Sequence, residues 1–257
     1  MAEQALALRE YPQIIELLAV LEQSGLTKER DEVSSLVEYI DSMEEKLGQM
    51  MGELQEMHGE VQKIQDKGLH ARCTRLLDTA QEKITQTGTM VSTVKTNFVR
   101  AAGNAVKSFK EKGRAALAQA VRAMKIPAVL SKMKDGFHRA AQAMQEAAGK
   151  VDTKREQLHE AGGHLKNAGR VLSGKEAKEA APLESDKGIL AKVRNTLSGM
   201  GRSFAAMEGR AGKLAEKLEA EPREADGRRS VKSELHTLKA RTGGKRLIAP
   251  VKEQARE

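Results

Sequence analysis

The sequence predicts an all-α protein made of long helices with coiled-coil heptads. Of its 257 residues, 31% are charged and only 2% are aromatic, and this balance is typical of long helices and coiled coils. Apolar residues also recur at alternating spacings of three and four, which is the period of an amphipathic helix. Aromatic residues are too scarce for the strands and pockets of a β-sandwich or an α/β enzyme. This period predicts the positions of the individual helices.

A short N-terminal helix is predicted within residues 1–25. Pro12 is expected to break or bend its first turn, because proline lacks a backbone N–H. Ser24 and Gly25 then favour a helix end, and Thr27 is a typical cap for the helix that follows.

The next segment carries the most regular heptad pattern of the chain, and we expect a rod-like helix over residues 28–67. Five heptads of apolar a and d positions strongly favour a coiled coil. Gly68 interrupts the register, and a helical face resumes at Leu69. The a and d residues are Val33, Leu36, Ile40, Met43, Leu47, Met50, Leu54, Met57, Val61 and Ile64.

Residues 91–125 follow an eleven-residue repeat instead, in which Phe98, Phe109 and Ala120 are equivalent. An eleven-residue repeat keeps an apolar stripe nearly straight along a helix, so we expect one continuous helix here. Its polar face is basic and forms a candidate anion-binding face. The candidate residues are Lys95, Arg100, Lys107, Lys110, Lys112, Arg114, Arg122 and Lys125.

Pro127 is predicted to end or kink this helix, and a second heptad run follows it to Leu172. Small residues flank this run and would let another helix approach closely. We therefore expect residues 27–176 to fold as an antiparallel helical bundle. Its apolar positions are Leu130, Met133, Phe137, Ala140, Met144, Ala147, Val151, Leu158, Ala161, Leu165, Ala168 and Leu172.

The C-terminal third is predicted to lie outside the bundle. Residues 177–186 form a linker around Pro182, and residues 187–220 form an extended C-terminal helix tethered by that linker. After it, the basic segment 221–257 has few apolar residues and is expected to be largely disordered.

Charge is distributed unevenly along the chain. Residues 1–68 carry 6 basic and 15 acidic side chains, a net charge of −9, whereas residues 95–139 carry 11 basic and 2 acidic ones, a net charge of +9. Such asymmetry indicates a polyanionic partner or internal pairing. The basic segment could pack on the acidic helix 28–67 of the same or a neighbouring chain. It could instead bind an anionic membrane surface or, together with the basic tail, nucleic acid without sequence preference.

The sequence offers no convincing catalytic, metal or cofactor motif. The spacing from Gly169 to Lys175 matches a phosphate-binding loop, but Glu176 replaces its Ser or Thr and no strand precedes it. His70 and Cys73 lie three residues apart, and two ligands are too few for zinc. We therefore expect neither enzyme activity, a cofactor nor a small-molecule substrate.

The expected location is the reducing cytoplasm. Cys73 is the only cysteine, residues 1–8 lack the features of a signal peptide, and the most apolar stretch is too short to span a membrane.

Several segments resemble an uncharacterised family of helical proteins carried on bacterial conjugative and other mobile elements. The resemblance covers roughly residues 30–176 and implies an accessory role without a known activity. It rests on LVEYIDSMEEKLGQM (36–50), NAVKSFKEKGRAAL (104–117), IPAVLSKMKDG (126–136) and EAGGHLKNAGRVLSGKE (160–176). The expected function is therefore that of a non-catalytic scaffold or interaction protein, with self-association or a helical partner.

Overall fold

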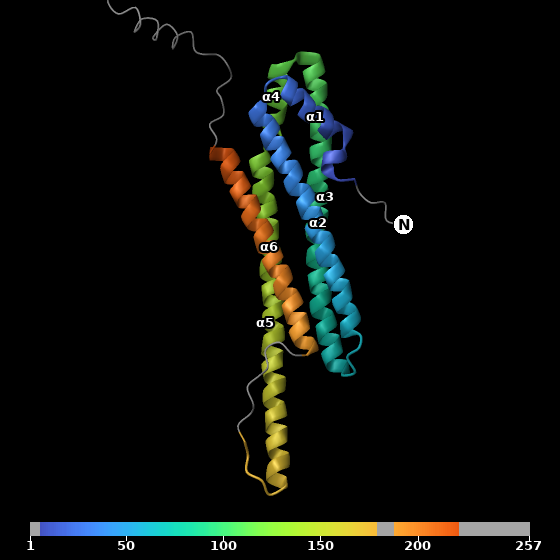
Figure 1. The fold of residues 1–257 in the computed structure, drawn as a ribbon, viewed down its shortest axis with the longest axis vertical. Helices are drawn as coiled ribbons and strands as arrows, with labels where there is room; N and C mark the ends of the chain where they lie inside the picture. Colours follow the sequence, from blue (N-terminus) through green and yellow to red (C-terminus); the bar gives the residue numbers. More distant parts are fainter. Residues whose placement is uncertain (1–5, 179–187, 221–257) are drawn as a thin grey trace, which may run out of the picture. The chain divides into compact units, whose positions relative to one another are not determined.

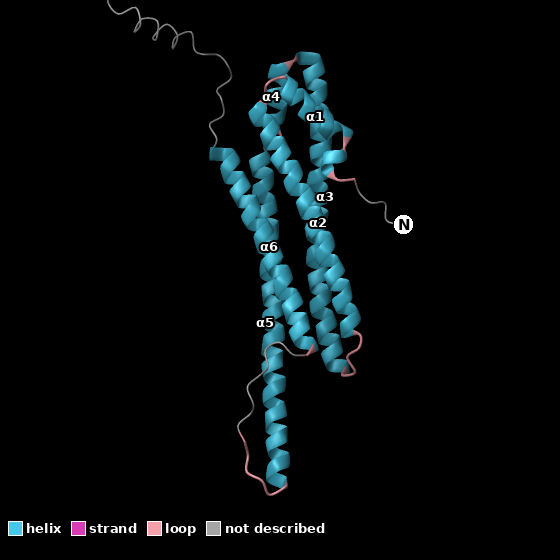
Figure 2. Ribbon diagram, in the orientation of Figure 1, coloured by secondary structure: helices cyan, strands magenta, loops and turns pink. Residues whose placement is uncertain are grey.

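The computed structural model describes residues 6–178 and 188–220, and every regular element in them is a helix, which confirms the predicted all-α class (Figure 2). The predicted tail 221–257 and most of the predicted linker lie outside the described residues. The elements are η1 (Leu8–Glu10), α1 (Pro12–Gln23), α2 (Thr27–Val61), α3 (Lys67–Lys112), α4 (Arg114–Ala123), α5 (Ile126–Leu172) and α6 (Ile189–Ala220).

The long helices are arranged as two antiparallel pairs (Figure 1). α2 and α3 pack together as a helical hairpin, and α5 packs along α6. The direction of the second pair follows from its contacts, since Gly201 lies beside Met144 whereas Gly212 lies beside Lys134. α1 packs on α3 near its C-terminal end, where Gln13 meets Gly103.

The core consists of the apolar faces that the helical period identified. Nine of the ten a and d residues predicted in the first heptad run are buried, and Ile64 is partly buried. Tyr39 links three helices, because its hydroxyl donates a hydrogen bond to the Met207 carbonyl at 2.9 Å and its ring meets Phe137 edge-on at 6.4 Å. The two pairs therefore share one core.

α2 ends earlier than the sequence predicted, at Val61 rather than near residue 67. A turn over residues 62–66 follows, and Asp66 caps α3 by accepting a hydrogen bond from the Leu69 amide at 2.8 Å. Neither glycine nor proline marks this turn. This turn explains why the heptad register changes near Gly68.

The predicted continuous helix 91–125 is wrong, because Gly113 divides it into α3 and α4. Gly113 has a φ of +75°, a left-handed backbone conformation that glycine adopts without steric cost. Pro127 lies in the first turn of α5, where its missing N–H leaves no hydrogen bond unmade.

α6 belongs to the bundle, whereas the sequence placed it outside as a tethered helix. The described residues up to Ala220, α6 included, form one compact unit. The reason is the apolar face of α6, which includes Phe204 and buries itself along α5.

Candidate interaction surfaces

Lys95, the first residue of the candidate anion-binding face, is buried and therefore cannot reach an external anion. Its side chain is 6% exposed and its Nζ lies 2.7 Å from Glu44 Oε2 and 2.6 Å from the Leu6 carbonyl. The ammonium group also stands 5.6 Å from the centre of the Tyr11 ring. This contact joins α3 to the acidic helix α2 and to the N-terminal segment.

Other cations of the face are paired with acids of the same chain. Lys110 lies 2.7 Å from Glu16 of α1, and Arg122 lies 3.5 Å from Glu29 of α2. Lys107 makes a long contact of 4.0 Å with Glu111 in its own helix. Part of the charge asymmetry is thus balanced internally, in agreement with the prediction that the basic segment packs on the acidic one.

The remaining cations of the candidate anion-binding face are exposed, but the apolar residues of the same segment are not exposed beside them. Arg100 donates a hydrogen bond to Asn97, while Lys112, Arg114 and Lys125 lie at the surface around the junctions of α3, α4 and α5. In the membrane interpretation Phe98, Val106, Phe109 and Leu117 would enter the lipid. Phe109 is partly buried against the core in this fold, and the other three are buried. No helix in the described part of the chain combines the length and apolarity needed to cross a membrane.

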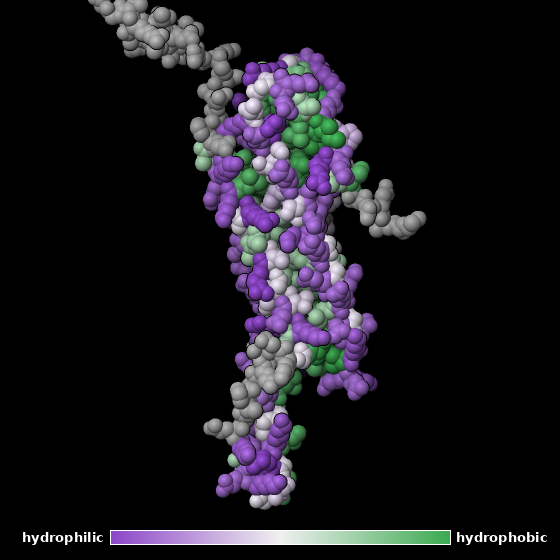
Figure 3. Space-filling model, in the orientation of Figure 1, coloured by the Kyte–Doolittle hydropathy of each residue, from purple (hydrophilic) through white to green (hydrophobic). Residues whose placement is uncertain are grey.

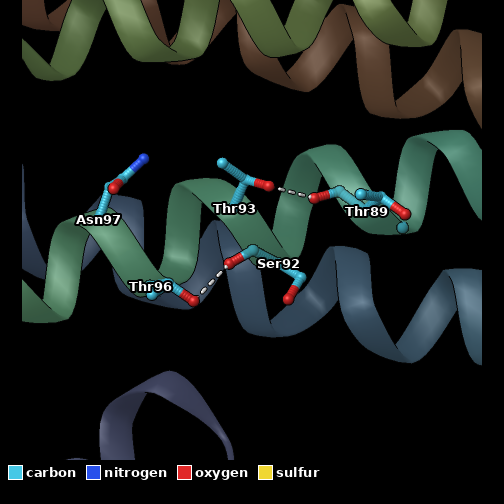
Figure 4. A pocket seen from close by; sticks show the side chains of 6 residues that line it. Thr89, Ser92, Thr93, Thr96 and Asn97 are labelled. Carbon is cyan, nitrogen blue, oxygen red and sulfur yellow. Dashed lines mark hydrogen bonds between the residues drawn. The ribbon is translucent and has the colours of Figure 1, made fainter.

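A shallow cavity on α3 is lined by hydroxyl groups, and its three threonines donate hydrogen bonds to backbone carbonyls (Figure 4). Thr93 donates to the Thr89 carbonyl at 2.8 Å, and Thr96 donates to the Ser92 carbonyl at 3.0 Å. Such bonds to the preceding helical turn occupy the hydroxyl protons. With no titratable side chain in its lining, this cavity has no group to act as an acid or a base.

The metal and phosphate motifs do not form sites either. Burial raises the pKa of the Cys73 thiol, which keeps it protonated and a poor ligand. Within residues 6–178 and 188–220, no three His, Cys, Asp or Glu side chains come close enough together to hold a metal ion. The segment that resembles a phosphate-binding loop continues α5. It ends in a helix C-terminal motif in which Gly174, with a φ of +70°, donates to the Val171 carbonyl.

The last five turns of α5 carry an apolar stripe that no described helix covers. We call residues 156–172 the α5 extension. None of its residues is buried, and Figure 1 shows it passing beyond the start of α6. Leu165 is 77% exposed and Leu172 is 89% exposed, and Figure 3 shows hydrophobic surface on this part of the molecule. The extension stripe consists of Leu158, Ala161, Leu165, Ala168 and Leu172.

An apolar groove adjoins the base of the α5 extension, where α3, α5 and α6 meet. It has a volume of about 250 Å³. Leu76 and Val151 contribute to its apolar floor, and four cations surround it. We call it the Leu76 groove, and its lining is Leu69, Arg72, Cys73, Arg75, Leu76, Lys150, Val151, Lys154 and Leu190.

The extension stripe and the groove are apolar surfaces on which another helix could pack. Among the described residues, no three His, Cys, Asp or Glu side chains form a cluster that could hold a metal ion. These features define a helical protein whose candidate site is an interaction surface. The chain belongs to a family of unknown function (DUF6674), whose family model matches residues 10–256. This confirms the expected membership of an uncharacterised family and extends it beyond the segment 30–176. Comparisons with curated proteins and with solved structures gave no match.

The heptad pattern predicts the stripe residues but not their exposure, because it places Leu158 and Leu165 in the bundle interior with the rest of their run. No sequence pattern indicates the groove, because Leu69 and Leu190 come from segments far apart in the chain. α6 begins at Ile189, so the stripe of α5 has no neighbouring helix beyond that point, and the heptad pattern does not predict where α6 begins.

Proposed function

We propose that this chain is a non-catalytic scaffold or interaction protein that binds another protein through the α5 extension. The observation that carries the proposal is the exposed extension stripe, which continues the buried heptad run of α5 past Val151. Leucines repeated every seven residues on one helix side are the usual contacts of helix pairing. An accessory role in a bacterial mobile element, implied by the resemblance described above, is part of the same proposal.

The properties of the other surfaces support a role in binding rather than catalysis. The three threonine hydroxyl groups in the α3 cavity donate to backbone carbonyls, and Cys73 is buried. General acid–base or nucleophilic catalysis needs groups that converge on a substrate. A stripe of leucines on a helix needs only another apolar surface.

Photo-crosslinking in the cells that encode the protein tests the proposal. A photoreactive amino acid at Leu165 points out of the stripe, whereas one at the exposed Glu160 lies on another side of the helix. We expect a protein crosslink, to any partner including a second copy, from position 165 and none from position 160. The proposal is wrong if position 165 gives no product beyond that of position 160.

A further inference from the structure

The described residues that follow α5, 173–178, do not cover the extension stripe. Asn167 holds this return segment, since its side chain donates to the Lys178 carbonyl at 2.7 Å and accepts from the Lys178 amide at 3.0 Å. Arg170 donates to the Glu176 carbonyl at 2.8 Å. In a helix with 3.6 residues per turn, Asn167 lies about 200° around the axis from Leu165. The described part of the return segment thus contacts the face opposite the leucines.

We propose that a second copy of this chain covers the stripe, with two α5 extensions packed antiparallel about a twofold axis. This inference rests on the proposed function and names its partner. The stripe is self-complementary, because leucines every seven residues alternate with alanines every seven. An axis near Gly163 places Leu158 over Ala168 of the second copy and Leu165 over its Ala161. Large side chains then fill the space beside small ones, which is how antiparallel helices pack closely.

The residues that flank the stripe favour pairing with an identical chain. Gln157, Gly162, His164 and Gly169 carry no fixed charge, so the twofold axis brings no two lysines, arginines or carboxylates face to face. Like charges in these positions are the usual means by which helices reject a copy of themselves. Gly162 and Gly169 also have open space where a Cβ would lie, which allows close approach of a second backbone.

The same register brings the Leu76 groove into the interface. Leu172 of one copy lies across from Lys154 of the other, at the edge of the groove. The exposed Leu172 side chain would then lie close to the apolar groove residues Leu76 and Val151 of the other copy.

Helix energetics also call for a partner. Glycine costs about 1 kcal/mol in a helix interior, and the α5 extension contains Gly162, Gly163 and Gly169. Unpacked helical segments of about 12–15 residues are marginal in water even with favourable sequences. A second copy would supply the tertiary packing that α6 supplies to the first half of α5.

Sedimentation of the purified full-length chain over a range of concentrations tests the pairing. We expect a monomer–dimer equilibrium whose dissociation constant rises at least about tenfold in Leu165→Glu, because the carboxylate would lie unpaired in an apolar layer. Leu165 is already exposed, so the variant should keep the helix content of the wild type. Ile15→Glu is the matched control, since Ile15 is 55% exposed on α1, away from the extension, and it should dimerise normally.

Disulfide trapping tests the orientation. A mixture of Leu158→Cys and Ala168→Cys chains, both with Cys73→Ser, should give a disulfide-linked heterodimer under mild oxidation, while each variant alone should give much less. A wild-type chain that stays monomeric, or a dimer unchanged by Leu165→Glu, overturns the pairing of two copies. If a different protein is then crosslinked from position 165 in cells, the proposed function stands and only the second copy is wrong.

Discussion

At the scale of single residues, the pair of Lys95 and Glu44 joins α3 to α2 at 2.7 Å, with the Lys95 side chain buried. We predict that Lys95→Ala lowers the free energy of unfolding by about 2 kcal/mol. Breaking a fully buried pair costs about 3–5 kcal/mol, and the loss is smaller here because the Glu44 side chain is 30% exposed. The double variant Lys95→Met/Glu44→Leu should recover most of the loss. Urea unfolding of the variants measures both effects, and a neutral Lys95→Ala would contradict the prediction.

Tyr39 makes stability depend on alkaline pH. Burial raises the pKa of its hydroxyl, and Arg210 opposes this shift weakly. The folded-state pKa thus lies above the unfolded value of about 10. The contribution of the hydroxyl to stability is therefore complete below about pH 10 and is lost as the pH rises towards the folded-state value. Tyr39→Phe should cost about 1 kcal/mol at pH 8, through the lost hydrogen bond to Met207.

The same variant should lose less stability than the wild type between pH 9 and pH 11.5. Thermal unfolding followed by circular dichroism at several pH values measures both curves. The difference between the two curves isolates the contribution of Tyr39 from every group that the two proteins share. Parallel curves would show that the ionisation of Tyr39 is not coupled to folding.

At the scale of elements, the sequence predicted which faces are buried better than where helices end. The heptad residues from Val33 to Val61 are buried because an apolar stripe on a long helix must find a neighbour. The turn after Val61 was missed, because its residues are common within helices and only Asp66 has a typical cap side chain. Gly113 was assigned to a continuous helix, since the eleven-residue repeat runs through it without a gap.

The cap at Asp66 provides a test at this scale. We predict that Asp66→Ala destabilises the chain by about 1 kcal/mol, the usual cost of losing an N-cap, because the Leu69 amide loses its acceptor. Gln65→Ala, at an exposed position one residue earlier, should change stability by less than about 0.5 kcal/mol. Equal effects in urea unfolding would show that the cap does not determine the start of α3.

At the scale of the whole molecule, a heptad pattern predicts that an apolar helix face is buried. It does not predict which other helix packs on that face. α6 covers α5 as far as the Leu76 groove, which Leu190 of α6 lines together with Val151 and Lys154 of α5. Beyond that point the same repeat produces the exposed leucines of the α5 extension. The heptad pattern predicts the residues of the extension stripe. It cannot predict that they are exposed, because their exposure depends on how α6 is aligned along α5.

Because α6 packs on the first part of α5 but not on the α5 extension, we predict that the two parts of α5 differ in local stability. In the Leu165→Glu variant, held as a monomer, amide hydrogens of residues 130–151 should exchange at least about 100-fold more slowly than those of residues 158–172. Local opening of an unpacked helix end costs little, whereas exposing the core requires unfolding of the compact unit. Hydrogen exchange followed by mass spectrometry resolves the two segments as separate peptides. In the wild type, raising the protein concentration should slow exchange in the second segment alone, because pairing covers only that part of α5. Uniform exchange along the helix, at every concentration, would show that the extension is stabilised within a single chain.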